Sequence, residues 1–281
     1  MVSANSSLDG EVSHSHPVIH KIGIADLREV LAKGLDDFAA MPTHSVFVIV
    51  IYPIMGLILL RLSFGYDLLP VVFPLVAGFT LLGPFAAIGL YEMSRRRELG
   101  LPASLDALSV FSLPRLWPIL VLGIVLMVIF LAWLMAAMAI YSGTFNNWYP
   151  TSIGDFANRL FATPAGWTLI LVGCGVGFCF AVVALAISVV SFPMLVDRDV
   201  SPGLAAATSI RAVAANPITM AVWGFIVAAA LVIGSLPVLV GLAIVLPVLG
   251  HSTWHLYRKV VEPGRDPNWQ SRPQVLSEGL R

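Results

Sequence analysis

Charged side chains are scarce in this sequence, and several long stretches contain no lysine, arginine, aspartate or glutamate. Charged residues make up 11% of the chain, against about 25% in an ordinary soluble domain, and hydrophobic residues make up 58%. An uncharged apolar run of about 18 residues or more is typical of a membrane-spanning helix, because a hydrocarbon core about 30 Å thick requires about 20 helical residues. The composition therefore excludes an ordinary soluble domain and predicts an all-α integral membrane protein in contact with the lipid bilayer.

The sequence also lacks a net charge, a cysteine framework and a signal peptide, and each absence excludes a class of function or location. The formal net charge is zero, so nothing indicates nucleic acid as a partner. Cys174 and Cys179, the two cysteines, lie in an apolar run at a spacing that puts them on different sides of a helix, which favours core packing over a shared metal ion. Residues 1–25 are polar and lack the apolar segment of a signal peptide, so we expect a disordered cytoplasmic tail there.

The apolar runs contain no acidic or basic residue at mid-depth. Ionisable groups inside the membrane are the usual mark of proton relays and coupled transport, so their absence argues against an energy-coupled carrier. No histidine lies deep in a run, where a haem-binding subunit would need its axial ligands. No nucleophile has a general base near it in sequence. We therefore expect a protein that is not an enzyme and has no cofactor.

Six spans are predicted from these runs. The first four are expected at Thr43–Leu62, Leu68–Tyr91, Leu116–Tyr141 and Trp167–Val196. The stretch 212–257 carries no formal charge and would be about 69 Å long as one helix, so it is read as two spans with a turn at Gly234–Pro237. The prediction is a six-helix membrane domain over 26–261, followed by a cytoplasmic tail over 262–281.

The lysines and arginines support the count of six. With six spans, almost all of them fall on one face: the N-terminal segment, the loops after spans two and four, and the C-terminal segment. The opposite face has only Arg61 and Arg159. A single span over 212–257 would move the C-terminal cations across and remove this asymmetry. The positive-inside rule then predicts a bacterial inner-membrane protein with both termini in the cytoplasm.

A weak internal repeat precedes spans one, three and five. The strings Phe38–Pro42, Val110–Pro114 and Val213–Pro217 each end an amphipathic segment with a proline. In the first segment, the apolar stripe consists of Leu27, Val30, Leu31, Leu35 and Phe38, and the charged residues, Asp37 among them, lie largely off it. The pattern suggests three units, each an interfacial amphipathic helix plus a transmembrane hairpin. The alternative is that loops close to lipid are amphipathic in general.

Two further patterns concern the predicted external side and the helix interiors. Ile153, Phe156 and Leu160 are spaced three and four apart, which predicts an amphipathic helix on the outer membrane surface. Gly173, Gly175 and Gly177 in span four are interpreted as close helix packing. Proline and glycine in spans two and six, including Pro84 and Pro247, have the composition of broken helices, which leaves a passive channel or small-solute permease as an alternative function.

His251 and His255 are the candidate metal ligands. They are four residues apart and therefore share one helix face, near the predicted cytoplasmic end of span six. Neutral imidazoles at this spacing can bind a transition metal or contact a haem. No third ligand is evident, however, and Trp254, Tyr257 and Arg258 beside them are typical of an interfacial anchor. A haem- or metal-binding protein is thus a further alternative.

Four strings together resemble an uncharacterised family of bacterial inner-membrane proteins. They are Asp26–Pro42, Phe73–Glu98, Ser191–Pro217 and Leu249–Val261, and they extend over nearly the whole chain from Asp26. The resemblance implies six helices, and some members carry a cytochrome c oxidase subunit label. It implies no activity and no site residues. The absence of deep histidines argues against a catalytic oxidase subunit and leaves an accessory or assembly role.

The function expected from the sequence is therefore a non-enzymatic accessory, assembly or scaffold component of a membrane complex. The predicted partners are the lipid bilayer and other membrane proteins, such as those of a respiratory complex, and no nucleic acid.

Overall fold

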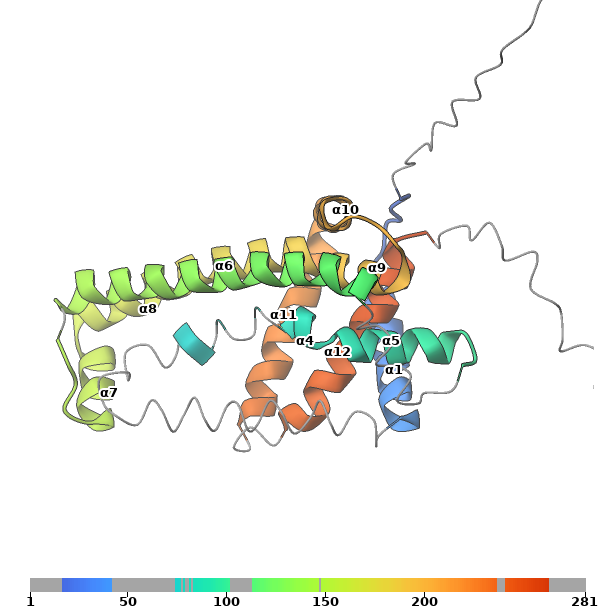
Figure 1. Ribbon diagram of the computed structural model, residues 1–281. Helices are drawn as coiled ribbons and strands as arrows, with labels where there is room; N and C mark the ends of the chain where they lie inside the picture. Colours follow the sequence, from blue (N-terminus) through green and yellow to red (C-terminus); the bar gives the residue numbers. More distant parts are fainter. Residues whose placement is uncertain are drawn as a thin grey trace, which may run out of the picture.

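The computed structural model describes residues 17–41, 74–76, 78, 81, 83–101, 113–146, 148–236 and 241–262, and within these ranges the regular elements are helices (Figure 1). In chain order they are α1 (Ile24–Ala40), α4 (Gly83–Ala86), α5 (Ile88–Glu98), α6 (Leu113–Phe145), α7 (Ile153–Ala162), α8 (Pro164–Ser188), α9 (Ser191–Asp197), α10 (Pro202–Ala215), α11 (Pro217–Ser235) and α12 (Leu242–Val260). The predicted all-α membrane class is confirmed.

The helices α6 and α8 form a long hairpin, with α7 across its tip (Figure 1). The start of α8 follows from its sequence: Thr163 caps it by accepting a hydrogen bond from the Gly166 N–H at 3.0 Å, and Pro164 occupies the first turn. Along the hairpin, Trp133 of α6 lies against Gly177 of α8, where a Cβ atom would meet the indole ring at 2.9 Å. The predicted close packing is therefore confirmed at Gly177. At Gly173 and Gly175 a Cβ atom would have no neighbour within 4 Å among the described residues, so α6 and α8 do not pack closely at these two positions.

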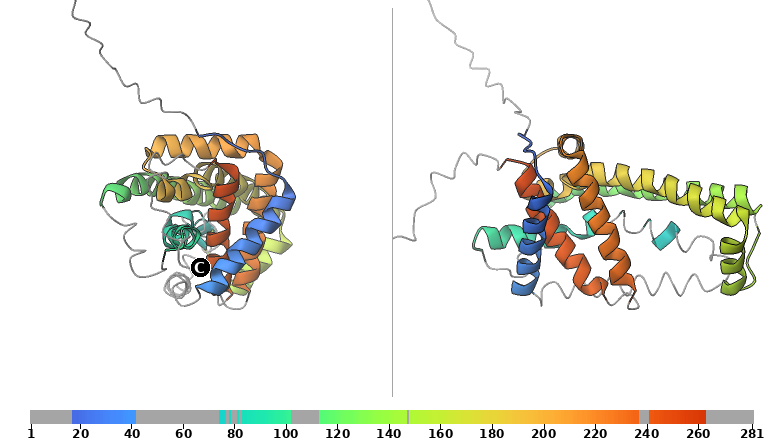
Figure 2. Two further views of the ribbon diagram at one scale, coloured as in Figure 1. Left: turned by 90° about the vertical axis from the view of Figure 1, so that its right-hand side faces the viewer. Right: turned by 180° about the vertical axis from the view of Figure 1, so that it is seen from behind.

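A second pair, α11 and α12, runs across the first pair rather than alongside it (Figures 1 and 2). Helix α11 ends at Ser235, as the predicted Gly234–Pro237 turn requires. Pro247 lies inside α12 without ending it, so the helix is not broken at this residue. The helix around Pro84 is interrupted, since α4 and α5 are separated at Ala87. A break in the second apolar run is therefore confirmed.

Three segments of the described ranges are long and apolar enough to cross a membrane: Leu116–Phe145, Pro164–Asp197 and Pro217–Ser235. They correspond to the predicted spans three, four and five. Helix α12 is not among them because its last turns are polar, ending in Arg258 and Lys259. The first predicted span lies outside the described residues, and so do residues 68–73, 77, 79, 80 and 82 of the second. The count of six spans and the orientation of the termini thus stay predictions.

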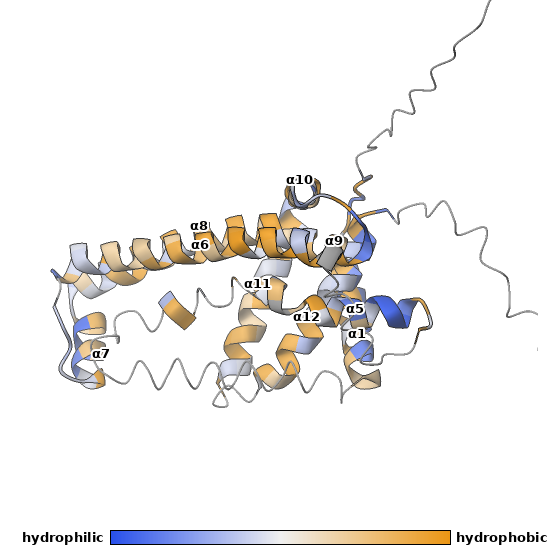
Figure 3. Cartoon of the chain, in the orientation of Figure 1, coloured by the Kyte–Doolittle hydropathy of each residue, from blue (hydrophilic) through white to orange (hydrophobic). Residues whose placement is uncertain are grey.

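Helices α1, α5 and α9 and the last three turns of α12 (residues 250–260) pack together into what we call the polar cap. Figure 3 shows the cap as the bluest part of the chain beside the largely orange α6–α8 hairpin. Its apolar centre contains Phe192, Trp254 and Tyr257, none of which is measurably exposed. Trp254 and Tyr257 are therefore not interfacial anchors, and that prediction is wrong.

Helix α1 is rotated relative to the predicted stripe. Leu27 and Val30 are buried as expected, but the buried face continues through Gly34 and Asp37, while Leu35 is 54% exposed. The reason is the close approach of α12: a Cβ atom on Gly34 would lie 2.0 Å from Ser252 Oγ. Only glycine permits that contact, and it brings Asp37 to the inside.

Residues 17–23, at the start of the described part of the chain, make backbone hydrogen bonds to other elements. Ile19 forms a β-bridge with Val261, and the His20 N–H donates to the Val260 carbonyl at 2.8 Å. On its other side, Asn216 at the α10–α11 junction accepts from the Ile22 N–H at 2.9 Å and donates to the His20 carbonyl at 3.1 Å. The segment therefore ties the end of α12 to the start of α11.

Two of the three predicted repeats share their local backbone. Met41, which ends α1, has φ −129° and ψ 47°, and Asn216, which ends α10, has φ −130° and ψ 50°. In both, the N–H is directed at the carbonyls three and four residues earlier, and the next residue is a proline. A residue before proline is disfavoured in the helical conformation, which explains why both helices stop there. The middle string, Val110–Pro114, lies largely outside the described residues.

Candidate functional site

The two candidate histidines lie in a buried polar network at the centre of the cap. The network consists of Asp37 from α1, Ser94 and Arg97 from α5, and His251 and His255 from α12. Asp37 Oδ2 accepts from Ser94 Oγ at 2.6 Å and pairs with His255 Nε2 at 2.9 Å. Its other oxygen accepts from Arg97 Nη1. Ser94 Oγ also lies 2.8 Å from His251 Nδ1. We refer to these five residues as the Asp37 network.

The hydrogen-bond roles in this network can be assigned from the number of protons. Ser94 Oγ has one proton, and at 2.6 Å it donates it to the Asp37 carboxylate. His251 Nδ1 must then be the donor to Ser94, since the hydroxyl has no second proton to offer. A serine whose proton is held by a carboxylate, and which faces a histidine N–H, is not activated as a nucleophile. Ser94 is also only 1% exposed, so substrate does not reach it in this arrangement.

Burial and hydrogen bonding act in opposite directions on Asp37. Burial by itself would raise the pKa of this carboxyl, but the hydrogen bonds from His255, Ser94 and Arg97, together with the charge interaction with His255, outweigh it. The pKa of Asp37 is therefore below its ordinary value, and the group is ionised at neutral pH. On the α12 side, His251 Nε2 and Ser252 Oγ are buried with no hydrogen-bond partner among the described residues.

Several other charges of the cap are also paired with one another. Glu92, which is 1% exposed, binds Arg95 at 2.7 Å and Arg96 at 3.0 Å. Arg258 joins Glu98 at 2.8 Å and Asp197 at 3.5 Å. The remaining pairs join Lys259 to Asp26 at 2.9 Å and to Glu29 at 2.7 Å.

The predicted local salt bridge in Asp197–Asp199 is confirmed, with Arg198 Nε 3.4 Å from Asp197. The same carboxylate also accepts from the Tyr257 hydroxyl at 2.6 Å, a contact that the sequence pattern did not indicate. Ser201 caps α10 as expected, since it accepts from the Leu204 N–H at 3.3 Å.

A cavity of about 430 Å³ opens beside the Asp37 network. Its cations are each held by a carboxylate: Lys33 by Glu29, Arg97 by Asp37, Arg258 by Glu98, and Lys259 by Asp26 and Glu29. Because each positive charge already has a partner, the cavity has little capacity to attract an anionic ligand. Its polar lining contributes mainly to holding α1, α5 and α12 together.

The arrangement of the histidines does not favour metal binding. His251 Nδ1 and His255 Nε2 are both used in hydrogen bonds within the network. Across the described ranges, no group of three or more His, Cys, Asp and Glu residues is placed to hold a metal ion. The proposed ligand pair stays a prediction, and its geometry is that of a structural hydrogen-bond network.

Sequence reasoning found the histidines but missed their partners Asp37, Ser94 and Arg97. It considered ionisable residues only at mid-depth in the apolar runs, and it did not predict the burial of Asp37 and Glu92, which lie outside the runs, or of His251, which lies near the end of one. No local pattern could have found the partners, because Asp37 is 57 residues from Ser94 and 218 from His255.

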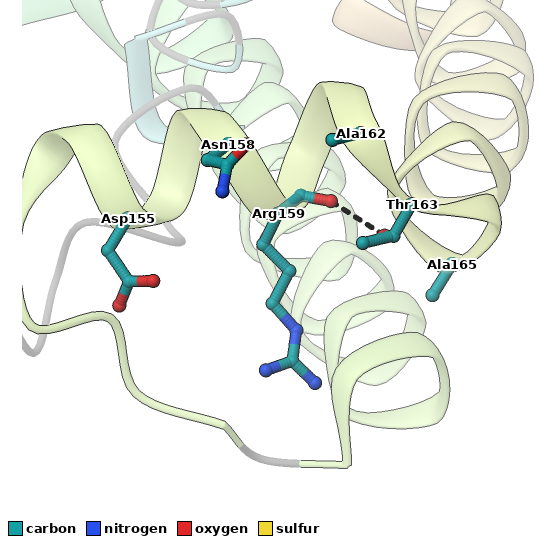
Figure 4. Close-up of a pocket in the computed structure, with 6 residues that line it drawn as sticks. All are labelled: Asp155, Asn158, Arg159, Ala162, Thr163 and Ala165. Carbon is teal, nitrogen blue, oxygen red and sulfur yellow. Dashed lines mark hydrogen bonds between the residues drawn. The ribbon is translucent and has the colours of Figure 1, made fainter.

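A second polar pocket lies at the far end of the hairpin, on α7 and the first turn of α8 (Figure 4). It has a volume of about 330 Å³ and is lined by Asp155, Asn158, Arg159, Ala162, Thr163 and Ala165. The predicted amphipathic helix is confirmed as α7, which is capped by Ser152 accepting from the Asp155 N–H at 3.0 Å. Arg159 is one of the two cations that the charge pattern assigned to the external face.

Comparison with known protein families gives a match over part of the chain. Residues 72–197 match a family model described as "Predicted integral membrane protein (DUF2189)". The resemblance to an uncharacterised membrane family is confirmed over this part of the chain, and the description contains no oxidase label. Neither the curated proteins nor the solved structures give a significant match.

Proposed function

We propose that this integral membrane protein is a non-enzymatic accessory or assembly component of a membrane complex, and that α8 is the helix with which it contacts its partner. The observation that carries the proposal is the exposure of α8. In an 18-residue apolar window of the stretch that includes α8, 6% of the residues are buried, against 22% in the corresponding windows of the stretches of α6 and of α11. Most of this helix is therefore available to other molecules.

The exposed surface of α8 includes one face suited to another helix. Leu171, Gly175, Phe178 and Val182 are spaced four, three and four apart and are all exposed, and we call them the outer face of α8. Leu171 and Phe178 are 68% and 69% exposed. A Cβ atom at Gly175 would have no neighbour within 4 Å. An exposed glycine allows the backbones of two membrane helices to approach closely, with the large side chains beside it packing around the contact, and packing of this kind drives helix association in lipid.

The chemistry of the cap supports the same proposal. Its buried ionisable groups, Asp37 and Glu92, are bound to several partners, and Ser94 is oriented as a donor to a carboxylate. A rigid, internally paired cap suits a protein that positions other subunits better than it suits one that turns over a substrate. The partner class expected from the sequence, a respiratory complex, is one candidate among membrane assemblies.

The test is purification of the full-length protein in mild detergent, followed by identification of co-purifying proteins by mass spectrometry. We expect a partner in a fixed ratio, and we expect Gly175→Leu to release it because the new side chain fills the space for the partner helix. Gly143→Leu, at an exposed and equally open position of α6, is the matched control and should retain the partner. A protein that purifies consistently without a partner would contradict the proposal.

A further inference from the structure

The pocket on α7 brings together an arginine that has no ion-pair partner among the described residues and a carboxylate one helical turn away. From this juxtaposition we infer that the pocket binds the headgroup of a phosphatidylethanolamine lipid, with Arg159 on the phosphate and Asp155 on the ammonium. The inference is independent of the proposed partner on α8. It uses only the confirmed membrane character of the chain and the place of α7 in the fold.

The position of α7 fits a site for lipid headgroups. It lies at the tip of a hairpin whose two helices are each long and apolar enough to cross a membrane (Figure 1). Ile153, Phe161 and Trp167 are 57%, 61% and 51% exposed around it. Exposed apolar and aromatic side chains next to a polar helix face are typical of the boundary between headgroups and acyl chains.

Arg159 supplies the anion-binding half of the pocket. Its guanidinium carbon lies 4.4 Å from the centre of the Trp148 ring and 5.4 Å from that of Phe145, so two aromatic faces hold the group in place. The side chain is partly buried, yet its guanidinium donates no hydrogen bond to any residue that the structure describes. A fixed planar guanidinium with unused donors matches two oxygens of a phosphate, which it can bind in a bidentate manner.

Asp155 supplies the cation-binding half. Its Oδ2 accepts from the N–H and from the hydroxyl of Thr151, both at 3.1 Å, and these bonds hold the carboxylate away from Arg159. The two residues are four apart on one helix face, where an ion pair would be expected, and none forms between them. Figure 4 shows both side chains leaving the same side of α7, separated from each other. Asp155 therefore keeps a negative charge that a second cation can use.

The pair of charges also selects among headgroups. A phosphate with a tethered primary ammonium places one charge of each sign in the pocket, and its N–H groups can donate to Asp155. A choline headgroup has no N–H to donate, and a glycerol headgroup has no positive charge to set against Asp155. The N-terminus of α8 is not used to bind the phosphate in this proposal. The Gly166 N–H in its first turn already donates to the Thr163 hydroxyl oxygen at 3.0 Å.

The experiment measures lipid binding to the delipidated full-length protein by native mass spectrometry. Phosphatidylethanolamine, phosphatidylglycerol and phosphatidylcholine with identical acyl chains are added one at a time. The wild-type protein is expected to retain phosphatidylethanolamine most strongly. Loss of the charge-assisted phosphate contacts in Arg159→Gln should weaken that binding by about tenfold. The Asp155→Asn variant should retain phosphatidylethanolamine and phosphatidylglycerol to nearly the same extent.

The controls separate this site from general attraction to lipid. Arg211→Gln removes an exposed cation from α10 and should leave the lipid preference unchanged. Arg159→Lys keeps the charge without the planar fork, so a smaller loss is expected, and it decides the question if Arg159→Gln does not fold. Equal retention of the three lipids by the wild type, or unchanged binding by both Arg159 variants, would overturn the inference. So would displacement of the lipid by millimolar inorganic phosphate, which would indicate a site for a free anion.

Discussion

In the polar cap the buried charges Asp37 and Glu92 are paired with other side chains, whereas in the α6–α8 hairpin large apolar side chains turn outward. Asp37 and Glu92 are 4% and 1% exposed, while Phe178 on α8 is 69% exposed. The cap satisfies its buried charges by pairing them, and the hairpin leaves its large apolar side chains to lipid or to another protein. The two regions differ because the buried charges of the cap are already bound to partners within it, while the exposed surface of the hairpin is largely apolar.

The largest effect on stability is expected from replacing Asp37 in the polar cap. Asp37→Asn leaves His255 and Arg97 without their common carboxylate, and removing one partner from a buried ion pair costs about 3 kcal/mol of stability. Thermal unfolding in detergent should show a large fall in the midpoint. Asp36→Asn, at the exposed neighbouring position, is the control and should change little. Equal midpoints for the two variants would mean that the Asp37 network does not hold the cap.

Some helices of this protein could be predicted from local sequence patterns, whereas the burial of Asp37 could not. The apolar runs located α6, α8 and α11, and the spacing of Ile153, Phe156 and Leu160 located α7, because helix periodicity and hydrophobicity are local properties. The Ser201 cap and the proline after Asn216 fixed where α10 begins and ends. The burial of Asp37 could not be predicted, since it depends on the missing side chain of Gly34 and on partners in two distant helices.

A smaller effect on stability is expected from replacing one glycine in each region, Gly34 in the cap and Gly173 in the hairpin. Gly34→Ala forces a Cβ atom to within 2.0 Å of Ser252 Oγ and 2.8 Å of Ser252 N, and crowding of this kind costs about 2 kcal/mol. Gly173→Ala in the hairpin meets open space and should change the stability by less than about 0.5 kcal/mol. Unfolding of both variants under the same conditions checks the contrast. If Gly173→Ala were the more damaging change, the cap would not be the tightly packed region.

The smallest effect concerns pH. Because the pKa of Asp37 is lower in the folded protein than its ordinary value of 3.8, its contribution to stability is complete above that pH and is lost as the pH falls through the folded pKa. The difference in unfolding midpoint between the wild type and Asp37→Asn should therefore be constant near neutral pH and shrink only in strong acid. A difference that shrinks as the pH rises would have the wrong sign for a stabilised carboxylate.

Crosslinking in intact membranes can test directly whether the outer face of α8 contacts another protein. A photoreactive residue is placed at Phe178 in one experiment and at Phe225 in another. Phe225 is 73% exposed on α11 and serves as an equally exposed position outside the α6–α8 hairpin. If α8 contacts another protein, we expect a discrete protein adduct from position 178 and no adduct of the same mass from position 225. No protein adduct from position 178, or the same adduct from both, would contradict it.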